Sequence, residues 1–98
     1  MKFEWDEQKN EANFRAHGIW FEDACYVFSD LSALNKYDSE HSAGEDRWLL
    51  LGSSPIDGNI YVLSHTYRKM NEDEMVRIIS ARKATRNEQE TYYRRCKK

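Results

Sequence analysis

The sequence has few of the residues that cross-link, break or bend a chain: two cysteines, one proline and four glycines among 98 residues. Two isolated cysteines cannot form a disulfide framework. No apolar run reaches the about 18 residues that a membrane-spanning helix needs, and the acidic N-terminus lacks the apolar segment of a signal peptide. We therefore expect one cytoplasmic domain over residues 1–98, with no linker and no contact with a membrane.

Recognised catalytic and cofactor motifs are missing as well. The sequence contains no Walker loop, no Gly-rich dinucleotide fingerprint and no Gly-x-Ser-x-Gly elbow. Asp38, His41, Glu45 and Asp46 are hard metal ligands close together, but their spacing matches no known site. A metal-dependent hydrolase built on Asp38, His41 and Glu45 stays an alternative, and no cofactor and no metal are predicted.

Charge is unevenly distributed along the chain, although the net charge is only −2. Residues 1–60 contain 5 Lys/Arg and 12 Asp/Glu, giving −7, whereas residues 61–98 contain 10 and 5, giving +5. Such asymmetry allows one basic face that attracts a polyanion. The alternative is a solvated basic helix at the C-terminus.

The spacing of apolar residues predicts three helices. Asp6 is a good N-cap for a helix that ends at Gly18. Apolar residues at helical spacing predict a second helix over 21–28, which has no capping residue before it. Thr85-Arg86-Asn87-Glu88 is a capping box that opens the last helix.

Between these helices the pattern changes to that of strands. Arg68–Asp73 reads as a polar connector, and Ser53–Asn59, with its Asp57-Gly58 pair, reads as a hairpin loop. The predicted strands are Phe3–Trp5, Leu31–Tyr37, Arg47–Gly52, Ile60–Tyr67 and Glu74–Arg82. The order β-α-α-β-β-β-β-α predicts an α+β fold with a mostly antiparallel sheet of about four strands.

Polar residues within the strands are candidates for chemistry. Arg77 lies in the middle of a strand, where an unpaired charge is costly, and His65 lies on the neighbouring strand. Arg47, Arg68 and Arg82 stand at strand ends close by. Guanidinium groups bind phosphate bidentately and histidine transfers protons near neutral pH, so this set suits a phosphodiester, among other ligands.

The same residues also have structural interpretations. Arg77 can pair with Glu45, Asp46 or Glu74, and a strand arginine more often serves stability than catalysis. His41 lies in a polar segment and is most simply a loop residue. The residue types alone therefore leave a nuclease as one hypothesis among several.

Segments along almost the whole chain resemble the BrnT family. The most specific are Phe3-Glu4-Trp5-Asp6 and Ile79-Ser80-Ala81-Arg82. The other matching residues are Lys9, Asn13, His17-Gly18, Phe21–Ala24, Val27-Phe28, Asp38, His41, Glu45–Trp48, Gly52-Ser53, Arg77-Ile78, Lys83–Thr85, Glu88 and Tyr92. The sequence departs from the family pattern at Ala16, Trp20 and His65.

This resemblance implies a toxin of a bacterial type II toxin–antitoxin system, with a compact RelE-like fold, that cleaves RNA and inhibits translation. The implied partner is a BrnA-like antitoxin with a ribbon–helix–helix part, in a complex of two toxins with an antitoxin dimer. Operator DNA is then reached only through the antitoxin.

We therefore predict a metal-independent endoribonuclease that cleaves RNA by transesterification. The predicted catalytic residues are His65, Arg77, Arg82, Arg47, Glu45 and His41, with His65, or His41 with Glu45, as base or acid. The predicted RNA-binding residues are Arg68, Lys83, Arg86, Arg94 and Arg95. The alternative is an inactive homologue that acts as antitoxin-binding co-repressor, which the acidic residues 1–60 favour.

Overall fold

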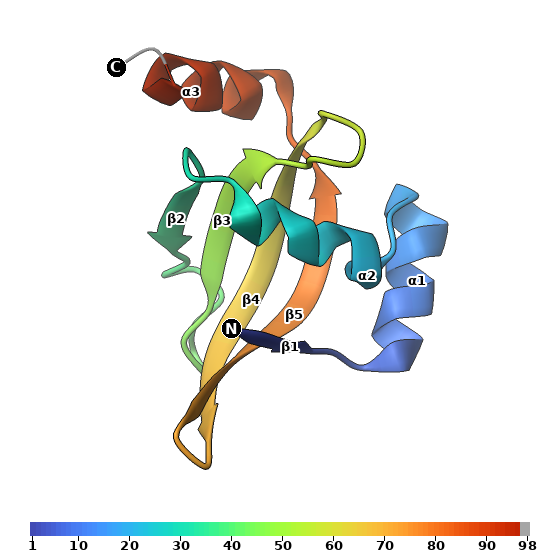
Figure 1. Cartoon of the computed structure of the whole chain (residues 1–98), viewed down its shortest axis with the longest axis vertical. Coiled ribbons are helices and arrows are strands. Elements are labelled where there is room, and N and C mark those ends of the chain that lie inside the picture. The colour runs from blue at the N-terminus through green and yellow to red at the C-terminus, as the bar shows by residue number, and fades with distance from the viewer. Residues whose placement is uncertain (97–98) are drawn as a thin grey trace.

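A computed structural model of the chain describes residues 1–96, except for the side chain of Met70. The elements follow one another as shown in Figure 1: β1 (Lys2–Glu4), α1 (Glu7–His17), α2 (Phe21–Ala24), a 3₁₀-helix η1 (Cys25–Ser29), β2 (Leu34–Tyr37), β3 (Trp48–Ser53), β4 (Ile60–Met70), β5 (Asp73–Lys83) and α3 (Arg86–Cys96). The α+β class predicted from the sequence is confirmed.

The sheet has five strands rather than about four, in the order β1-β5-β4-β3-β2. Neighbouring strands are antiparallel except β1, which runs parallel to β5 with Phe3 opposite Val76. The side chain of Phe3 packs against the buried core. Burial of this apolar residue accounts for the docking of a three-residue strand at the edge of the sheet.

The ends of α1 follow the prediction. The Asp6 carboxylate accepts hydrogen bonds from the backbone amides of Gln8 and Lys9 at 2.8 and 3.3 Å. Gly18 closes the helix in the left-handed region, with φ at 74°, and its amide donates to the carbonyl of Phe14. A residue without a side chain adopts this conformation at no steric cost.

The second predicted helix forms only one α-helical turn, α2, before it tightens into η1. Trp20 provides no side-chain cap, as the sequence indicated. The Oδ1 atom of Asn10 in α1 instead accepts the Phe21 amide at 2.7 Å. A residue of the preceding helix thus provides the missing cap.

The prediction of a polar connector at Arg68–Asp73 is wrong. β4 continues to Met70 and β5 begins at Asp73, so only Asn71 and Glu72 form the turn, with φ values of 53° and 74°. Two residues at positive φ are typical of the tight turn that matches strand twist. Glutamate rarely occupies this position, so the sequence carried no Asn-Gly or Asp-Gly signal for the turn.

Apolar residues are buried on both faces of the sheet. On the side of α2, Phe21, Val27, Leu63 and Ile78 are almost completely buried. On the other side, a smaller cluster lies under α3 and includes Tyr92. No helix among the described residues is long and apolar enough to cross a membrane.

Candidate functional site

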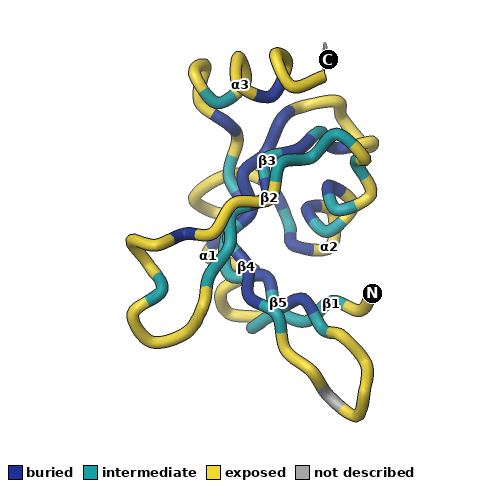
Figure 2. Tube along the Cα trace, turned by 90° about the vertical axis from the view of Figure 1, so that its left-hand side faces the viewer, coloured by how far each residue is buried: buried dark blue, intermediate teal, exposed yellow. Residues whose placement is uncertain are grey.

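One face of the sheet is only partly covered. α2 lies on one side, and the loop between β2 and β3 extends from the other side, as the edge-on view in Figure 2 shows. On the side of this loop, Ser64 of β4 and Ser80 of β5 lie opposite each other and are half-buried. We call this side the open face.

The open face contains a hollow of about 380 Å³ between the β2–β3 loop and the strands β3, β4 and β5. We call it the central hollow. It combines basic, acidic, hydroxyl and apolar side chains. Its lining residues are Asp38, Glu40, His41, Arg47, Leu49, Ser64, Ile79, Ser80 and Arg82.

An irregularity in β5 brings Arg82 into the hollow. Ser64 pairs with Ser80 whereas His65 pairs with Ile78, so Ile79 is an extra residue in β5. Strict alternation would place Arg82 on the same face as Val76 and Ile78, which are buried. A β-bulge resets the alternation, so that Ala81 enters the core and Arg82 reaches the open face.

His41 is held by a buried carboxylate. Its Nδ1 atom lies 2.9 Å from Oδ2 of Asp38, whose side chain is 9% exposed, while the His41 side chain is 64% exposed. The Ser42 hydroxyl fastens the loop, because it donates to the Asp38 carbonyl and accepts the Arg47 amide. A carboxylate on Nδ1 orients the ring and leaves Nε2 available to a substrate.

Arg47 and Arg82 line the hollow from two different elements, the first from the end of the β2–β3 loop and the second from β5. The Nη1 and Nη2 atoms of Arg82 donate to the two carboxylate oxygens of Glu88 at 2.8 and 3.0 Å. Arg47 Nε is buried and makes no hydrogen bond within the described residues. Oε1 of Glu45 lies 3.9 Å from this atom, and the Glu45 side chain is about half exposed.

Arg77 and Arg68 lie further along the open face and do not line the central hollow. Both contact Glu4 of β1, with Oε1 at 3.6 Å from Arg77 Nη1 and 3.1 Å from Arg68 Nε. The sequence suggested Glu45, Asp46 or Glu74 as partners of Arg77. Glu4 takes this place because it lies opposite Arg77 in the parallel β1–β5 pairing.

His65 lies on the opposite face of the sheet from the central hollow and is completely buried. Its ring packs edge-on against Phe28, and its nitrogens face the Leu63 carbonyl at 3.2 Å and the Tyr67 hydroxyl at 3.3 Å. Burial lowers its pKa. The structure therefore does not bring His65 together with Arg47 and Arg82, and we leave it out of the candidate site.

Substitution of His65 is expected to affect stability and not chemistry. His65→Gln should lower the free energy of unfolding by about 1–3 kcal/mol, because buried polar contacts are lost. Because the pKa of His65 is lowered in the folded protein, His65 is protonated more readily in the unfolded chain as the pH falls below about 6.5. The free energy of unfolding of the wild type should therefore decrease in this pH range. His65→Gln should lack this contribution to the pH dependence. Urea unfolding at several pH values measures both effects. If folded His65→Gln no longer cleaved RNA, His65 would have to be counted among the catalytic residues.

The predicted RNA-binding residues are distributed over β4, β5 and α3. Lys83 ends β5 beside the β3–β4 loop, and Arg86 begins α3 and lies 3.8 Å from Glu90. Arg94 and Arg95 lie in the last turn of α3, where Arg95 Nε donates to the Ser32 carbonyl. Only Arg47 and Arg82, among the arginines singled out, meet at one hollow.

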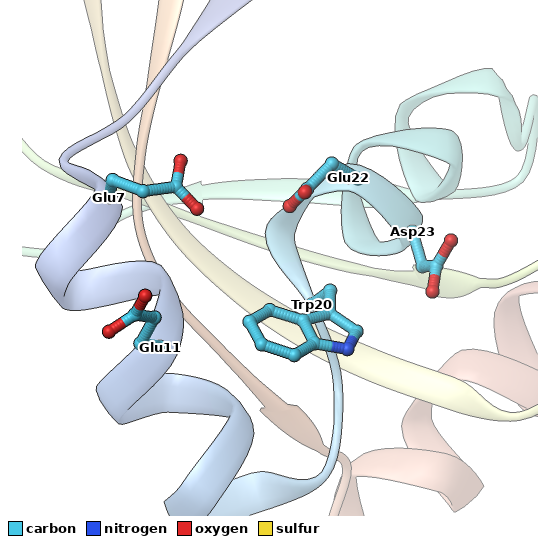
Figure 3. Close-up of a pocket in the computed structure, with 5 residues that line it drawn as sticks. All are labelled: Glu7, Glu11, Trp20, Glu22 and Asp23. Carbon is cyan, nitrogen blue, oxygen red and sulfur yellow. The ribbon is translucent and has the colours of Figure 1, made fainter.

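A second hollow, of about 450 Å³, lies on the other side of the molecule between α1 and α2. Figure 3 shows four carboxylates around Trp20: Glu7, Glu11, Glu22 and Asp23. Such a concentration of negative charge repels phosphate. The acidic hollow is therefore not a candidate for RNA binding.

The residues of the metal alternative do not gather. Asp38 and His41 are in contact, but Glu45 lies beside Arg47. Within the described residues, no group of three His, Cys, Asp or Glu side chains is placed to hold a metal ion.

Sequence reasoning assigned no role to Asp38 outside that metal alternative, and did not single out Ser64. The family resemblance contained Asp38 without a role for it. The spacing of Asp38 and His41 within one polar loop was the only signal for their contact.

A family model described as "Ribonuclease toxin, BrnT, of type II toxin-antitoxin system" matches residues 5–88. No curated protein matches the chain significantly. The matched range contains every residue that lines the central hollow.

Proposed function

The chain belongs to the BrnT family of ribonuclease toxins of type II toxin–antitoxin systems, and from this premise we propose that the central hollow is its RNA-cleaving site. The observation that carries this proposal is the oriented pair His41–Asp38 in the same hollow as Arg47 and Arg82. A proton acceptor and two phosphate-binding groups are what transesterification of RNA requires.

In the proposed reaction, the Nε2 atom of His41 takes the proton of a ribose 2′-hydroxyl. The resulting oxygen attacks the adjacent phosphorus, the bond from phosphorus to the 5′ oxygen breaks, and the leaving oxygen takes a proton from water. Arg47 and Arg82 hold the phosphate and neutralise the charge that grows on its oxygens. Asp38 keeps the imidazole oriented and stabilises its protonated form. No step uses a metal ion.

Ser64 and Ser80 also line the hollow. Their hydroxyls can donate to phosphate or ribose oxygens without adding charge. Arg68 and Arg77, further along the open face, continue the basic surface on which a longer RNA strand lies. These contacts hold the RNA backbone and carry no base specificity.

Membership of a type II toxin family implies an antitoxin partner. We propose that this partner is a BrnA-like protein with a ribbon–helix–helix part, in a 2:2 complex that binds operator DNA through the antitoxin. We further propose a RelE-like fold and a cytoplasmic location, where both RNA and antitoxin are found. The rival function is an inactive homologue that acts only as co-repressor.

The test of the proposed function is RNA cleavage by the purified protein in excess chelator. We expect products with 2′,3′-cyclic phosphate and 5′-hydroxyl ends, and His41→Ala should lower kcat by about 10²–10⁴-fold, because the general base is lost. His17→Ala, at the exposed end of α1, is the matched control and should cleave like the wild type. Intact RNA with folded wild-type protein would favour the co-repressor, and cleavage that stops on chelation would favour a metal-dependent reaction.

A further inference from the structure

The contacts around Arg82 extend beyond the central hollow into α3. Glu88 lies in the first turn of this helix, and both of its carboxylate oxygens accept from Arg82, at 2.8 and 3.0 Å. Bidentate pairs of this kind are stronger and more directional than single hydrogen bonds. The contact lowers the pKa of Glu88 to about 2, so Glu88 is ionised at any physiological pH.

Glu88 is itself fixed in place. Its Oε1 atom accepts the Thr85 amide at 2.8 Å, and its own amide donates to the Thr85 hydroxyl at 3.2 Å. These reciprocal bonds are a capping box, as the sequence predicted. The carboxylate that holds Arg82 is therefore attached to the start of a helix and not to a mobile side chain alone.

α3 is anchored to the body of the protein at two further points. The Ala84 amide donates to the Ile60 carbonyl at 2.8 Å, just before the helix begins. Tyr92 is buried in the apolar cluster on the open face of the sheet, and its hydroxyl donates to the Asp30 carboxylate at 2.5 Å. Because the helix is held just before its first residue and again at Tyr92, the position of the Glu88 carboxylate is set by the fold.

The geometry of the pair decides which part of Arg82 remains available. A guanidinium has five N–H donors. Glu88 takes one from Nη1 and one from Nη2, and the Lys83 carbonyl lies 3.3 Å from Nη1. Nε and the second Nη2 donor have no partner among the described residues. These two donors lie on one edge of the planar group and match two oxygens of a phosphate.

We propose that Glu88 is a positioning residue that holds Arg82 with its Nε and Nη2 edge presented to the scissile phosphate. This inference rests on the proposed function of the central hollow. A long side chain held in one conformation loses little entropy when the transition state forms. Glu88 touches no reacting atom, so its effect passes entirely through Arg82.

Glu88→Gln separates this role from helix capping. The glutamine carbonyl oxygen can still accept the Thr85 amide, since glutamine also occurs at this position of capping boxes. Its amide group, however, presents donors to the donors of Arg82, so the bidentate pair is lost. We expect kcat to fall by about 10–100-fold, while KM changes by less than about 3-fold, because orientation matters mainly in the transition state.

Two controls distinguish positioning from stability. Thr85→Ala removes half of the capping box but leaves the Glu88–Arg82 pair, so the melting temperature should fall with kcat close to that of the wild type. Glu90→Gln, in the same helix, removes a carboxylate that lies near Arg86 only and should change neither value. In an Arg82→Lys background, Glu88→Gln should have little additional effect on kcat, since the two residues act as one unit.

A second measurement does not depend on activity. In the wild type, NMR should show separate, slowly exchanging Nη protons for Arg82, and these should average in folded Glu88→Gln. Wild-type kcat or unchanged Nη signals in Glu88→Gln would overturn the positioning role and leave the proposed function intact. Absence of RNA cleavage by the wild type itself would overturn the proposed function, and the positioning role with it.

Discussion

Arg82→Ala is expected to lower the kcat for RNA cleavage by about 10²–10³-fold, the usual cost of removing one group that stabilises transition-state charge. Arg82 reaches the central hollow from β5 and carries a guanidinium edge without a partner among the described residues. Expression of the variant in bacteria should therefore no longer arrest growth. The measurement is single-turnover cleavage of a labelled RNA, together with growth curves.

Arg82→Lys tests whether the shape of the guanidinium group matters in addition to its charge. Lysine keeps the charge but lacks the planar fork, so it should recover only a part of the activity. Arg15→Ala, in the last turn of α1 and outside the hollow, is the matched control and should cleave and arrest growth like the wild type. Unchanged cleavage by Arg82→Ala would place the reacting phosphate elsewhere on the molecule.

Asn13→Ala is expected to cause the largest loss of stability, about 2–4 kcal/mol in the free energy of unfolding. The Asn13 side chain is buried beside the part of β5 that β1 does not cover. Its amide donates to the Ala81 carbonyl at 2.9 Å and accepts the Ala81 amide at 3.0 Å, as a neighbouring strand would. It also donates to the Ile19 carbonyl.

Removal of this side chain leaves three buried backbone groups without partners, and each such group costs about 1–3 kcal/mol before relaxation. Because small domains have only about 5–15 kcal/mol of stability in total, the loss should be plain in urea unfolding. Asn35→Ala is the matched control, since Asn35 is exposed and its side chain donates a hydrogen bond to the Tyr67 hydroxyl. A loss of similar size at both positions would show that the pairing with Ala81 is unimportant.

The sequence alone determined most of the local structure. The caps of α1 and α3 and the approximate positions of β3, β4 and β5 follow from short-range rules of spacing and capping. It also determined the family, because Phe3–Asp6 and Ile79–Arg82 can be read without knowing the fold. These features depend on residues close together in the chain.

Only the tertiary structure decided which candidate residues meet. Alternation along β4 and β5 gave no way to place a bulge at Ile79, and without that bulge Arg82 would point into the core. Sequence reasoning grouped His65 with the arginines, whereas the strand turns this ring to the opposite face, against Phe28.

The contact of Asp38 with His41 and that of Glu88 with Arg82 also became known only from the structure. The physical reason is that a face of a sheet is set by register and bulges, which depend on strand pairing across the whole domain. Spacing along the chain shows which residues can act, and the pairing of strands decides which of them share one hollow.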